Sequence, residues 1–201
     1  MLYCEKFDRW FDSNSVDRIY EYYSQNSLTH YHRLSHIGDC WMYLKHPSIF
    51  PHVSSELKFS IIYHDIIYDP SSNKNEENSA ALAILDLSSI YKDEPKKLSK
   101  IVDLILSTKH NRALTSDEET QCILDIDLSI LGSEPKKYEL YSSNVFLEYR
   151  PFVSRKDYVK GRIEFLSKML DRSKIYYKLK ELEVNARKNI SNEILHLSGK
   201  F

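Results

Sequence analysis

Glycine is scarce in this chain, and this scarcity narrows the possible folds more than any other feature of the sequence. Only 4 of the 201 residues are glycine, whereas an average usage of roughly 7% would give about 14. Tight β-turns and glycine-rich phosphate loops need glycine because their backbone adopts positive φ angles or approaches a ligand closely. The shortage therefore disfavours an all-β fold and argues against P-loop and Rossmann-type nucleotide sites.

The remaining pattern is helical almost throughout. Apolar residues recur at spacings of three and four, and the six prolines stand near segment boundaries. Capping signals mark several ends: Ser54 or Ser55 before one helix, a Ser116–Glu119 capping box before another, and Gly132 after the latter. We predict an all-α bundle of about eight to nine helices. The predicted helices cover residues 16–24, 31–44, 55–68, 75–90, 95–108, 117–130, 135–149, 155–171 and 173–197.

Composition and cysteine usage limit the compartment and the partners. Hydrophobic residues make up 42% of the chain and the formal net charge is -1, so a core is expected and binding of a nucleic-acid polymer through overall charge is not. Cys4, Cys40 and Cys122 include no C-x-x-C pair, which favours a reducing compartment over a disulfide framework. The N-terminus lacks an apolar signal region, and no apolar run reaches the roughly 18 residues of a membrane span. We expect a cytoplasmic protein without a membrane partner.

Histidine and aspartate residues occupy positions that the helical pattern places toward the core. His32 and His36 are four residues apart and share a helix face. His64 and Asp65 interrupt an apolar stretch that we expect to be one helix, and Asp127 lies on an apolar helix face. Each could be satisfied separately by a carbonyl, a helix cap or an arginine, because a buried charge is costly without a partner. Three such places on three helices favour a common metal centre instead.

The donor types indicate which chemistry such a centre supports. Imidazole nitrogens with carboxylate oxygens suit Mn, Fe, Co, Ni or Zn, and a carboxylate-rich site can also use Mg. Four protein ligands leave positions on an octahedral ion for water and for a phosphate oxygen. A divalent ion lowers the pKa of water and neutralises the charge that develops on phosphorus. We therefore expect one divalent ion, or two, and phosphate chemistry.

The order of these residues resembles the signature of the HD superfamily of metal-dependent phosphohydrolases. The pattern His…His-Asp…Asp reads here as His36, His64-Asp65 and Asp127. The segment YHRLSHI is similar to the Y-H-x-x-x-H segment of several branches, including cyclic-nucleotide phosphodiesterases. YHDIIYDP, NEENSA, STKH, DIDLSILG and the tail at 158–176 resemble a small bacterial-type group of predicted HD phosphohydrolases. The resemblance implies one domain over 1–201, with a core at about 28–180 and the C-terminal helix packed on it.

The resemblance also implies roles for individual residues at the centre. It makes metal ligands of His36, His64, Asp65 and Asp127, with Asp65 bridging if a second ion binds. His32 matches the histidine that protonates the leaving oxygen in the phosphodiesterase branch; the alternative is a histidine that only packs beside the site.

Four further residues are candidates for the reaction or the substrate. Glu76 matches the glutamate of the N-E-x-x-S-A segment, and in some members an acidic residue downstream of the HD pair orients the attacking water. Glu76 could instead complete a capping box with Asn73. His110 matches the family's histidine after the T-x-H turn, which could bind a phosphate or a second metal; the alternative is an exposed histidine in a turn. Lys109, with Arg112 nearby, could attract a polyanion or form a solvated turn.

Arg162 is the last of these candidates. It could bind a phosphate through two hydrogen bonds, or pair with a core carboxylate such as Glu148.

We predict a metal-dependent phosphohydrolase that cleaves a phosphomonoester or phosphodiester bond in a small nucleotide-like substrate. One alternative is a non-catalytic nucleotide-sensing or interaction module that keeps the metal for structure. A second is a di-iron HD oxygenase, which needs extra histidine ligands between the HD pair and the final aspartate; only His110 lies there. A homodimer is compatible with the sequence.

Overall fold

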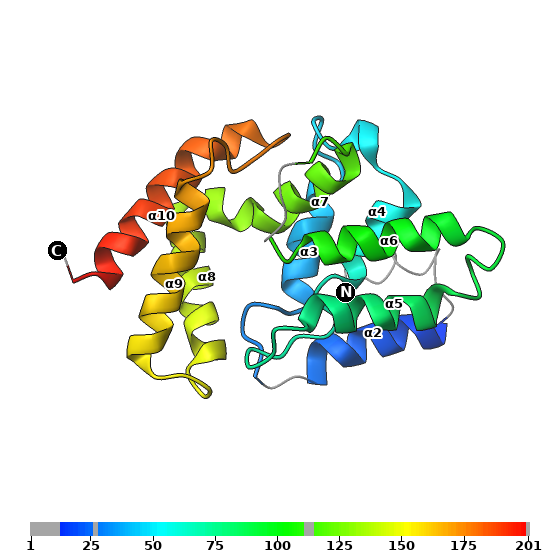
Figure 1. Cartoon of the computed structure of the whole chain (residues 1–201), viewed down its shortest axis with the longest axis horizontal. Helices are drawn as coiled ribbons and strands as arrows, with labels where there is room; N and C mark the ends of the chain where they lie inside the picture. Colours follow the sequence, from blue (N-terminus) through cyan, green and yellow to red (C-terminus); the bar gives the residue numbers. More distant parts are fainter. Residues whose placement is uncertain (1–12, 26–27, 111–114, 200–201) are drawn as a thin grey trace.

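The structure is a computed structural model of the whole chain, and it describes residues 13–25, 28–110 and 115–199. Over these ranges it contains nine α-helices, three short 3-10 helices and no strand, which confirms the predicted all-α class (Figure 1). The α-helices are α2 (Ser13–Gln25), α3 (Leu34–Tyr43), α4 (Ser55–Tyr63), α5 (Asn75–Leu87), α6 (Pro95–Ser107), α7 (Glu118–Asp127), α8 (Pro135–Tyr149), α9 (Arg155–Leu170) and α10 (Glu183–Leu197). The 3-10 helices are η1 (Phe50–His52), η2 (Leu128–Gly132) and η3 (Lys180–Leu182). Cys4, Arg112 and the N-terminal segment considered for a targeting signal lie outside the described residues.

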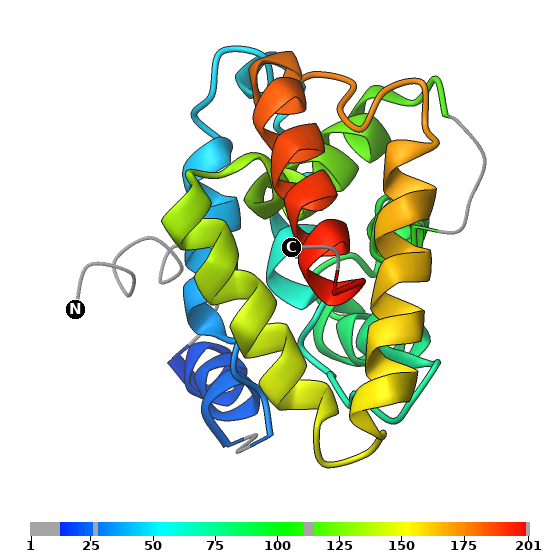
Figure 2. The same cartoon turned by 90° about the vertical axis from the view of Figure 1, so that its left-hand side faces the viewer.

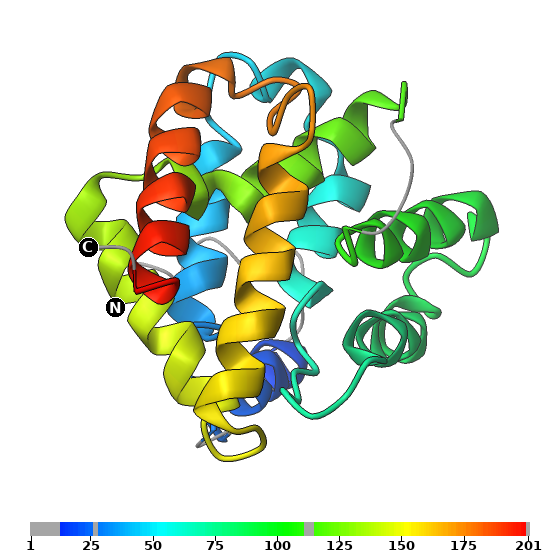
Figure 3. The same ribbon diagram turned by 60° about the vertical axis from the view of Figure 1, so that its left-hand side comes forward.

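The helices form two groups that are joined in the middle of the molecule. In one group, α5 and α6 pack against each other and against α4, and in Figure 3 this pair projects away from the rest. In the other group, α10 lies between α8 and α9 (Figure 2). The short helix η2 contacts α7, α8 and α10 and so connects the two groups. The buried hydrophobic side chains of all nine helices form one continuous core.

Helix α4 ends earlier than the sequence predicts. The helix stops at Tyr63 and not near Tyr68, so His64 is its C-terminal cap and Asp65 lies beyond it. Side chains of α5 bind the backbone that would have continued the helix: Ile67 N–H donates to Ser79 Oγ (3.1 Å) and Asp69 N–H donates to Asn75 Oδ1 (3.0 Å). The predicted position of the HD pair inside a helix is therefore wrong.

The last predicted helix, at 173–197, begins only at Glu183. Before it, the backbone N–H groups of Tyr177, Lys178 and Leu179 all donate to the carboxylate of Asp125. Asp125 is fully buried on α7. A non-helical segment satisfies this carboxylate, whereas a helix would have used the same N–H groups internally. The spacing of apolar residues gives no information about these three hydrogen bonds, because they join segments more than 50 residues apart.

The structure confirms one predicted N-cap, that of α4, and contradicts another, that of α7. Ser54, one of the two candidates, caps α4 by accepting a hydrogen bond from Leu57 N–H at 3.0 Å. The cap of α7 is Asp117 and not Ser116, and Glu119 instead accepts a hydrogen bond from Ser54.

Gly132 ends η2 but serves packing more than capping. A Cβ atom on Gly132 would lie 2.5 Å from Leu182 Cβ and 2.8 Å from the Leu182 carbonyl oxygen. The missing side chain thus lets the segment before α10 approach η2 closely.

Candidate metal centre

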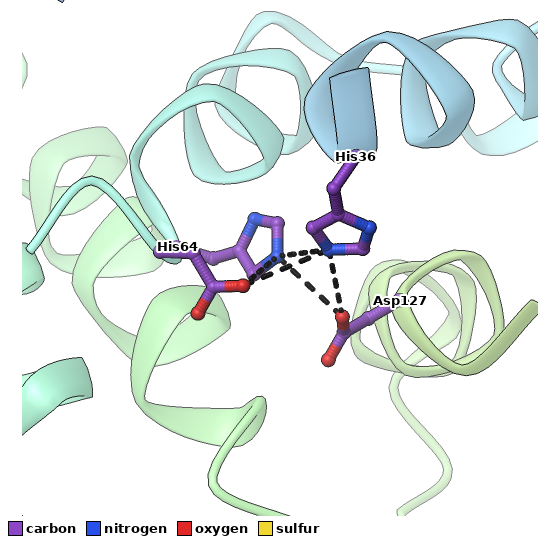
Figure 4. A group of neighbouring side chains, drawn as sticks. His36, His64 and Asp127 are labelled. Atoms are coloured by element: carbon purple, nitrogen blue, oxygen red, sulfur yellow. Dashed lines mark hydrogen bonds and ion pairs between the residues drawn. The ribbon is translucent and has the colours of Figure 1, made fainter. Parts of the chain in front are cut away.

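Four side chains from three helix ends meet at one point in the interior. His36 comes from α3, His64 caps α4 with Asp65 following it, and Asp127 is the last residue of α7. Each offers one ligand atom, and these atoms all lie within 4.8 Å of one another. Figure 4 shows His36, His64 and Asp127 pointing toward one another from their separate helices. The structure thus brings together all four residues that the sequence singled out as ligands.

The distances within the group are those of a shared ligand sphere. His36 Nε2 lies 3.2 Å from His64 Nε2 and 3.3 Å from Asp127 Oδ1. His64 Nε2 lies 3.2 Å from Asp65 Oδ2 and 3.5 Å from Asp127 Oδ1. Two ligands on one ion with bonds of about 2.1 Å lie no more than about 4.2 Å apart. The four donors therefore fit around one divalent ion with small side-chain adjustments.

A hydrogen bond orients His64 for binding a metal. Its Nδ1–H donates to the carbonyl oxygen of Ile61 at 2.9 Å. In this tautomer Nε2 carries a lone pair, and Nε2 is the atom that faces the other ligands. On His36, Nδ1 lies 3.7 Å from Cys40 Sγ, while Nε2 faces the centre. Both imidazoles thus present the same ring nitrogen to the same point.

The centre attracts positive charge. Burial lowers the pKa of His64, but Asp65 and Asp127 outweigh burial, and the net pKa lies well above its ordinary value. Burial raises the pKa of both carboxyl groups, and the neighbouring histidines reverse this, so that both pKa values are lowered. Two ionised carboxylates in one buried group favour a bound cation, whether a proton or a divalent metal ion.

The open side of the centre is the carboxylate side. The side chains of His36 and His64 are 3% and 2% exposed, whereas those of Asp65 and Asp127 are 14% and 17% exposed. An ion in this group would be closed off by imidazoles on one side and reachable past the carboxylates on the other. This arrangement suits a reactive site better than a fully closed structural one.

His110 reaches the centre from the end of α6. Its Nε2 lies 2.8 Å from Asp127 Oδ2, and Arg172 donates to its carbonyl oxygen at 2.9 Å. The residue has a positive φ of 53°, rare for a side chain other than glycine. Its Nδ1 is buried without a hydrogen-bond partner among the described residues. The structure thus places His110 against a candidate ligand.

His32 is held beside the centre by Glu148 of α8. His32 Nδ1 lies 2.7 Å from Glu148 Oε2, and the ring stacks on Tyr68 with centroids 3.7 Å apart. Burial lowers the pKa of His32, but Asp65 and Glu148 outweigh it and raise the net pKa. The His32 and His36 rings meet edge to face at 6.1 Å.

Sequence reasoning missed the importance of Glu148. Its Oε1 accepts the backbone N–H groups of His30, Tyr31 and His32, at 2.7, 2.6 and 2.9 Å. The one signal in the sequence was its position on the buried stripe of α8, in register with Tyr138, Tyr141 and Val145.

Two other candidates meet at the start of α5: Glu76 lies in its first turn, and Lys109 reaches it from just after α6. Lys109 Nζ donates to the Asn73 carbonyl oxygen (2.7 Å) and to Glu77 (2.6 Å), and it lies 3.8 Å from Glu76 Oε2. Glu76 does not complete a capping box, because the N-cap of α5 is Lys74 and makes no side-chain cap bond. Lys109 therefore ties the end of α6 to the start of α5, and Glu76 faces that contact.

Arg162 pairs with Glu193 and not with Glu148. Its Nε donates to Glu193 Oε1 at 2.9 Å, its Nη2 donates to Glu193 Oε2 at 3.2 Å, and its Nη1 donates to the Tyr141 hydroxyl at 3.1 Å. All three nitrogens of the buried guanidinium are thus engaged inside the protein, which favours the structural role over phosphate binding. Sequence spacing gave no indication of Glu193, which lies 31 residues away on α10.

Across the described ranges, no helix is both long and apolar enough to cross a membrane. Comparison of the chain with protein-family models, with curated proteins and with solved structures found no match.

Proposed function

We propose that the protein is a metal-dependent phosphohydrolase of the HD type, acting on a phosphomonoester or phosphodiester bond in a small nucleotide-like substrate. The observation that carries the proposal is the group of His36, His64, Asp65 and Asp127, whose ligand atoms lie within 4.8 Å of one another. Their order along the chain, and the motifs around them, resemble the HD signature.

The residues of the centre would hold one divalent ion, or two, with His110 available beside Asp127. Such an ion supplies a Lewis acid that polarises a phosphate oxygen and lowers the pKa of water. The two imidazoles fix the inner side of the site through their Nε2 atoms, and the more exposed carboxylates leave the outer side open to substrate.

His32 is the best placed proton donor. Glu148 accepts the Nδ1–H of the ring, and this adjacent carboxylate raises the pKa of His32. A protonated ring then carries a second proton on Nε2, which it can donate to the leaving alkoxide. Glu148 acts on this step through His32, as a positioning residue.

The test combines metal analysis with a hydrolysis screen. Purified protein should retain divalent metal, and it should release phosphate or nucleoside from a panel of nucleoside monophosphates and cyclic nucleotides with Mn²⁺, Co²⁺ or Mg²⁺. Asp65→Ala should lose both metal and hydrolysis. The matched control is Asp103→Ala, which changes an exposed aspartate on α6 and should leave both unchanged.

The outcomes separate the rival functions. Bound metal without hydrolysis of any substrate in the panel would overturn the proposed reaction and support a non-catalytic module. Full metal binding by Asp65→Ala would overturn the proposed centre itself. Consumption of O₂ by an iron-loaded sample would instead support the oxygenase alternative.

A further inference from the structure

Arg172 differs from the other arginines of the described ranges that are not exposed. Arg162 donates to both carboxylate oxygens of Glu193, and Arg187 donates to Glu183 at 2.7 Å. The side chain of Arg172 makes one hydrogen bond within these ranges, from Nη2 to the carbonyl oxygen of a histidine, and it forms no ion pair there. A partly buried cation without an anionic partner is costly to the protein, so this guanidinium is available to an anion from outside.

The pKa values of Arg162 and Arg172 show the same difference. Burial lowers the pKa of both guanidinium groups. For Arg162, Tyr141 and Glu193 outweigh burial, and the net pKa is raised well above its ordinary value. For Arg172, Tyr177 alone opposes burial, and the net pKa stays lowered. An arginine remains charged in either case, so Arg172 carries a positive charge that no carboxylate of the described ranges offsets.

One residue, His110, joins Arg172 to the candidate metal centre. Its carbonyl oxygen accepts the hydrogen bond from Arg172 at 2.9 Å, and its Nε2 lies 2.8 Å from Asp127 Oδ2. The other oxygen of Asp127, Oδ1, faces His36 and His64. His110 thus contacts the oxygen of Asp127 that does not face the imidazoles, and Arg172 lies beyond His110. A substrate that reaches the centre past its more exposed carboxylates would approach this guanidinium.

The backbone around Arg172 is held by α10. It belongs to the segment that joins α9 to α10, the orange loop in Figure 3. Arg187 Nη2 donates to the carbonyl oxygen of Arg172 at 2.8 Å, and Glu183 accepts the backbone N–H of Ile175 at 3.0 Å. The segment is therefore fixed on both sides of the free guanidinium. This favours binding, because a ligand then orders only the end of one side chain.

We propose that Arg172 binds an anionic oxygen of the substrate's phosphate, through guanidinium N–H groups that make no hydrogen bond to any described residue. The planar fork of an arginine matches phosphate geometry. The inference rests on the proposed phosphohydrolase function for the identity of the anion. It assigns phosphate recognition to Arg172 in place of Arg162 and Lys109, whose charges already meet Glu193 and Glu77.

Isothermal titration of the Mn²⁺-loaded, full-length protein with inorganic phosphate tests the assignment without turnover. Arg172→Met should weaken phosphate binding by about 10- to 100-fold, the loss expected when hydrogen bonds from a charged group are removed. Arg172→Lys should lose less, because it keeps the charge but not the fork. Neither variant should change the affinity for Mn²⁺. The matched control is Arg155→Met, which removes an exposed arginine at the other end of α9 and should leave phosphate binding unchanged.

The outcomes separate this inference from the proposed function. Equal phosphate affinity of wild type and Arg172→Met would overturn the inference, as would absence of phosphate binding to the Mn²⁺-loaded wild type. Equal weakening by Arg155→Met would show a general effect of charge and would also overturn it, as would loss of Mn²⁺ binding in Arg172→Met. Phosphate binding that requires Arg172, in a protein that hydrolyses nothing in the panel, would support the inference and overturn only the proposed reaction.

A substrate from the panel provides a second measurement once one is hydrolysed. Arg172→Met should then raise KM by about tenfold or more and change kcat less, because the hydrogen bonds to the phosphate already form in the bound substrate. A fall in kcat with KM unchanged would contradict a role for Arg172 in binding the phosphate.

Discussion

Two regions bury charged side chains, and they do so in opposite ways. In the network of α8, α9 and α10, Arg162 donates to both oxygens of Glu193, and Tyr138 and Ser142 complete the carboxylate. At the candidate metal centre, all the ion-pair partners of Asp65 and Asp127 within the described part of the chain are histidines. The network is complete within the protein, whereas the centre attracts a further cation.

This difference separates residues that hold the fold from residues that are available for chemistry. A buried ion pair whose hydrogen bonds are all made stabilises one arrangement and offers nothing to a ligand. Two carboxylates and two imidazoles that share one point are costly together unless a cation joins them. The network should therefore depend little on metal, and the centre should depend on it strongly.

The largest effect expected is that of breaking the complete network. Arg162→Met leaves Glu193 buried without its cation, and we expect the free energy of unfolding to fall by roughly 3–5 kcal/mol. Urea unfolding with chelator present measures this loss, and the metal content of the folded variant should be unchanged. Arg155→Met, at the exposed start of the same helix, is the control and should cost far less. A loss below about 1 kcal/mol for Arg162→Met would contradict the completeness of the network.

Metal addition should act on the centre alone. A divalent ion at 100 times its dissociation constant stabilises the folded state by about 2.7 kcal/mol. We expect this gain in the wild type and, from a lower starting stability, in Arg162→Met. Asp65→Ala should show none of it. Thermal unfolding with and without chelator checks all three proteins, and an equal gain in Asp65→Ala would place the metal elsewhere.

The helical fold and the four candidate metal ligands could be predicted from the sequence, whereas contacts between distant segments could not. Prolines and apolar periodicity mark helices α6, α8 and α9 to within one residue at each end, because those signals act locally. The four candidate metal ligands were singled out because two donor types repeat on apolar faces, and because their order along the chain resembles a known signature.

The errors arose where one side chain binds distant backbone. Asp125 takes the N–H groups of 177–179, and Ser79 takes that of Ile67, so two predicted helices are shorter than their periodicity suggests. The contact of Glu148 with His32 and the pairing of Arg162 with Glu193 were missed for a related reason: in each case the two residues lie on different elements, 116 and 31 residues apart. The residue spacing within one helix does not indicate which residues of other elements its side chains will contact.

Asp125 and Asp127 show the same contrast within the single helix α7. Asp125 accepts three backbone N–H groups, so Asp125→Asn should cost about 2 kcal/mol of stability and leave metal binding intact. Asp127→Asn should lose metal affinity instead and change the stability of the metal-free protein far less. Isothermal titration with Mn²⁺ and urea unfolding separate the two effects. Loss of metal affinity in Asp125→Asn, together with loss of stability in Asp127→Asn, would contradict both predicted roles.

The smallest effect concerns Glu148, which shares a feature with each region. It is a buried carboxylate whose hydrogen bonds are made within the protein, like Glu193, and it pairs with a histidine, like the aspartates of the centre. Glu148→Gln keeps an acceptor for the backbone N–H groups of 30–32 but removes the charge beside His32. We expect a loss of about 1.5 kcal/mol for one charge-assisted hydrogen bond. The pKa of His32 should also fall, which NMR titration of the ring can follow.

The stability cost of Glu148→Gln should decrease as the pH rises. Because the pKa of His32 is raised in the folded state, its pairing with Glu148 stabilises the protein fully below the unfolded value of about 6.5 and loses that contribution as the pH rises through the folded pKa. The cost of Glu148→Gln, measured with chelator present, should therefore be largest near about pH 6 and smaller at about pH 9. His32→Gln provides the matched control, since without the imidazole Glu148→Gln should lose this pH dependence. A cost that is constant with pH would mean that Glu148 serves the backbone alone and does not set the charge of His32.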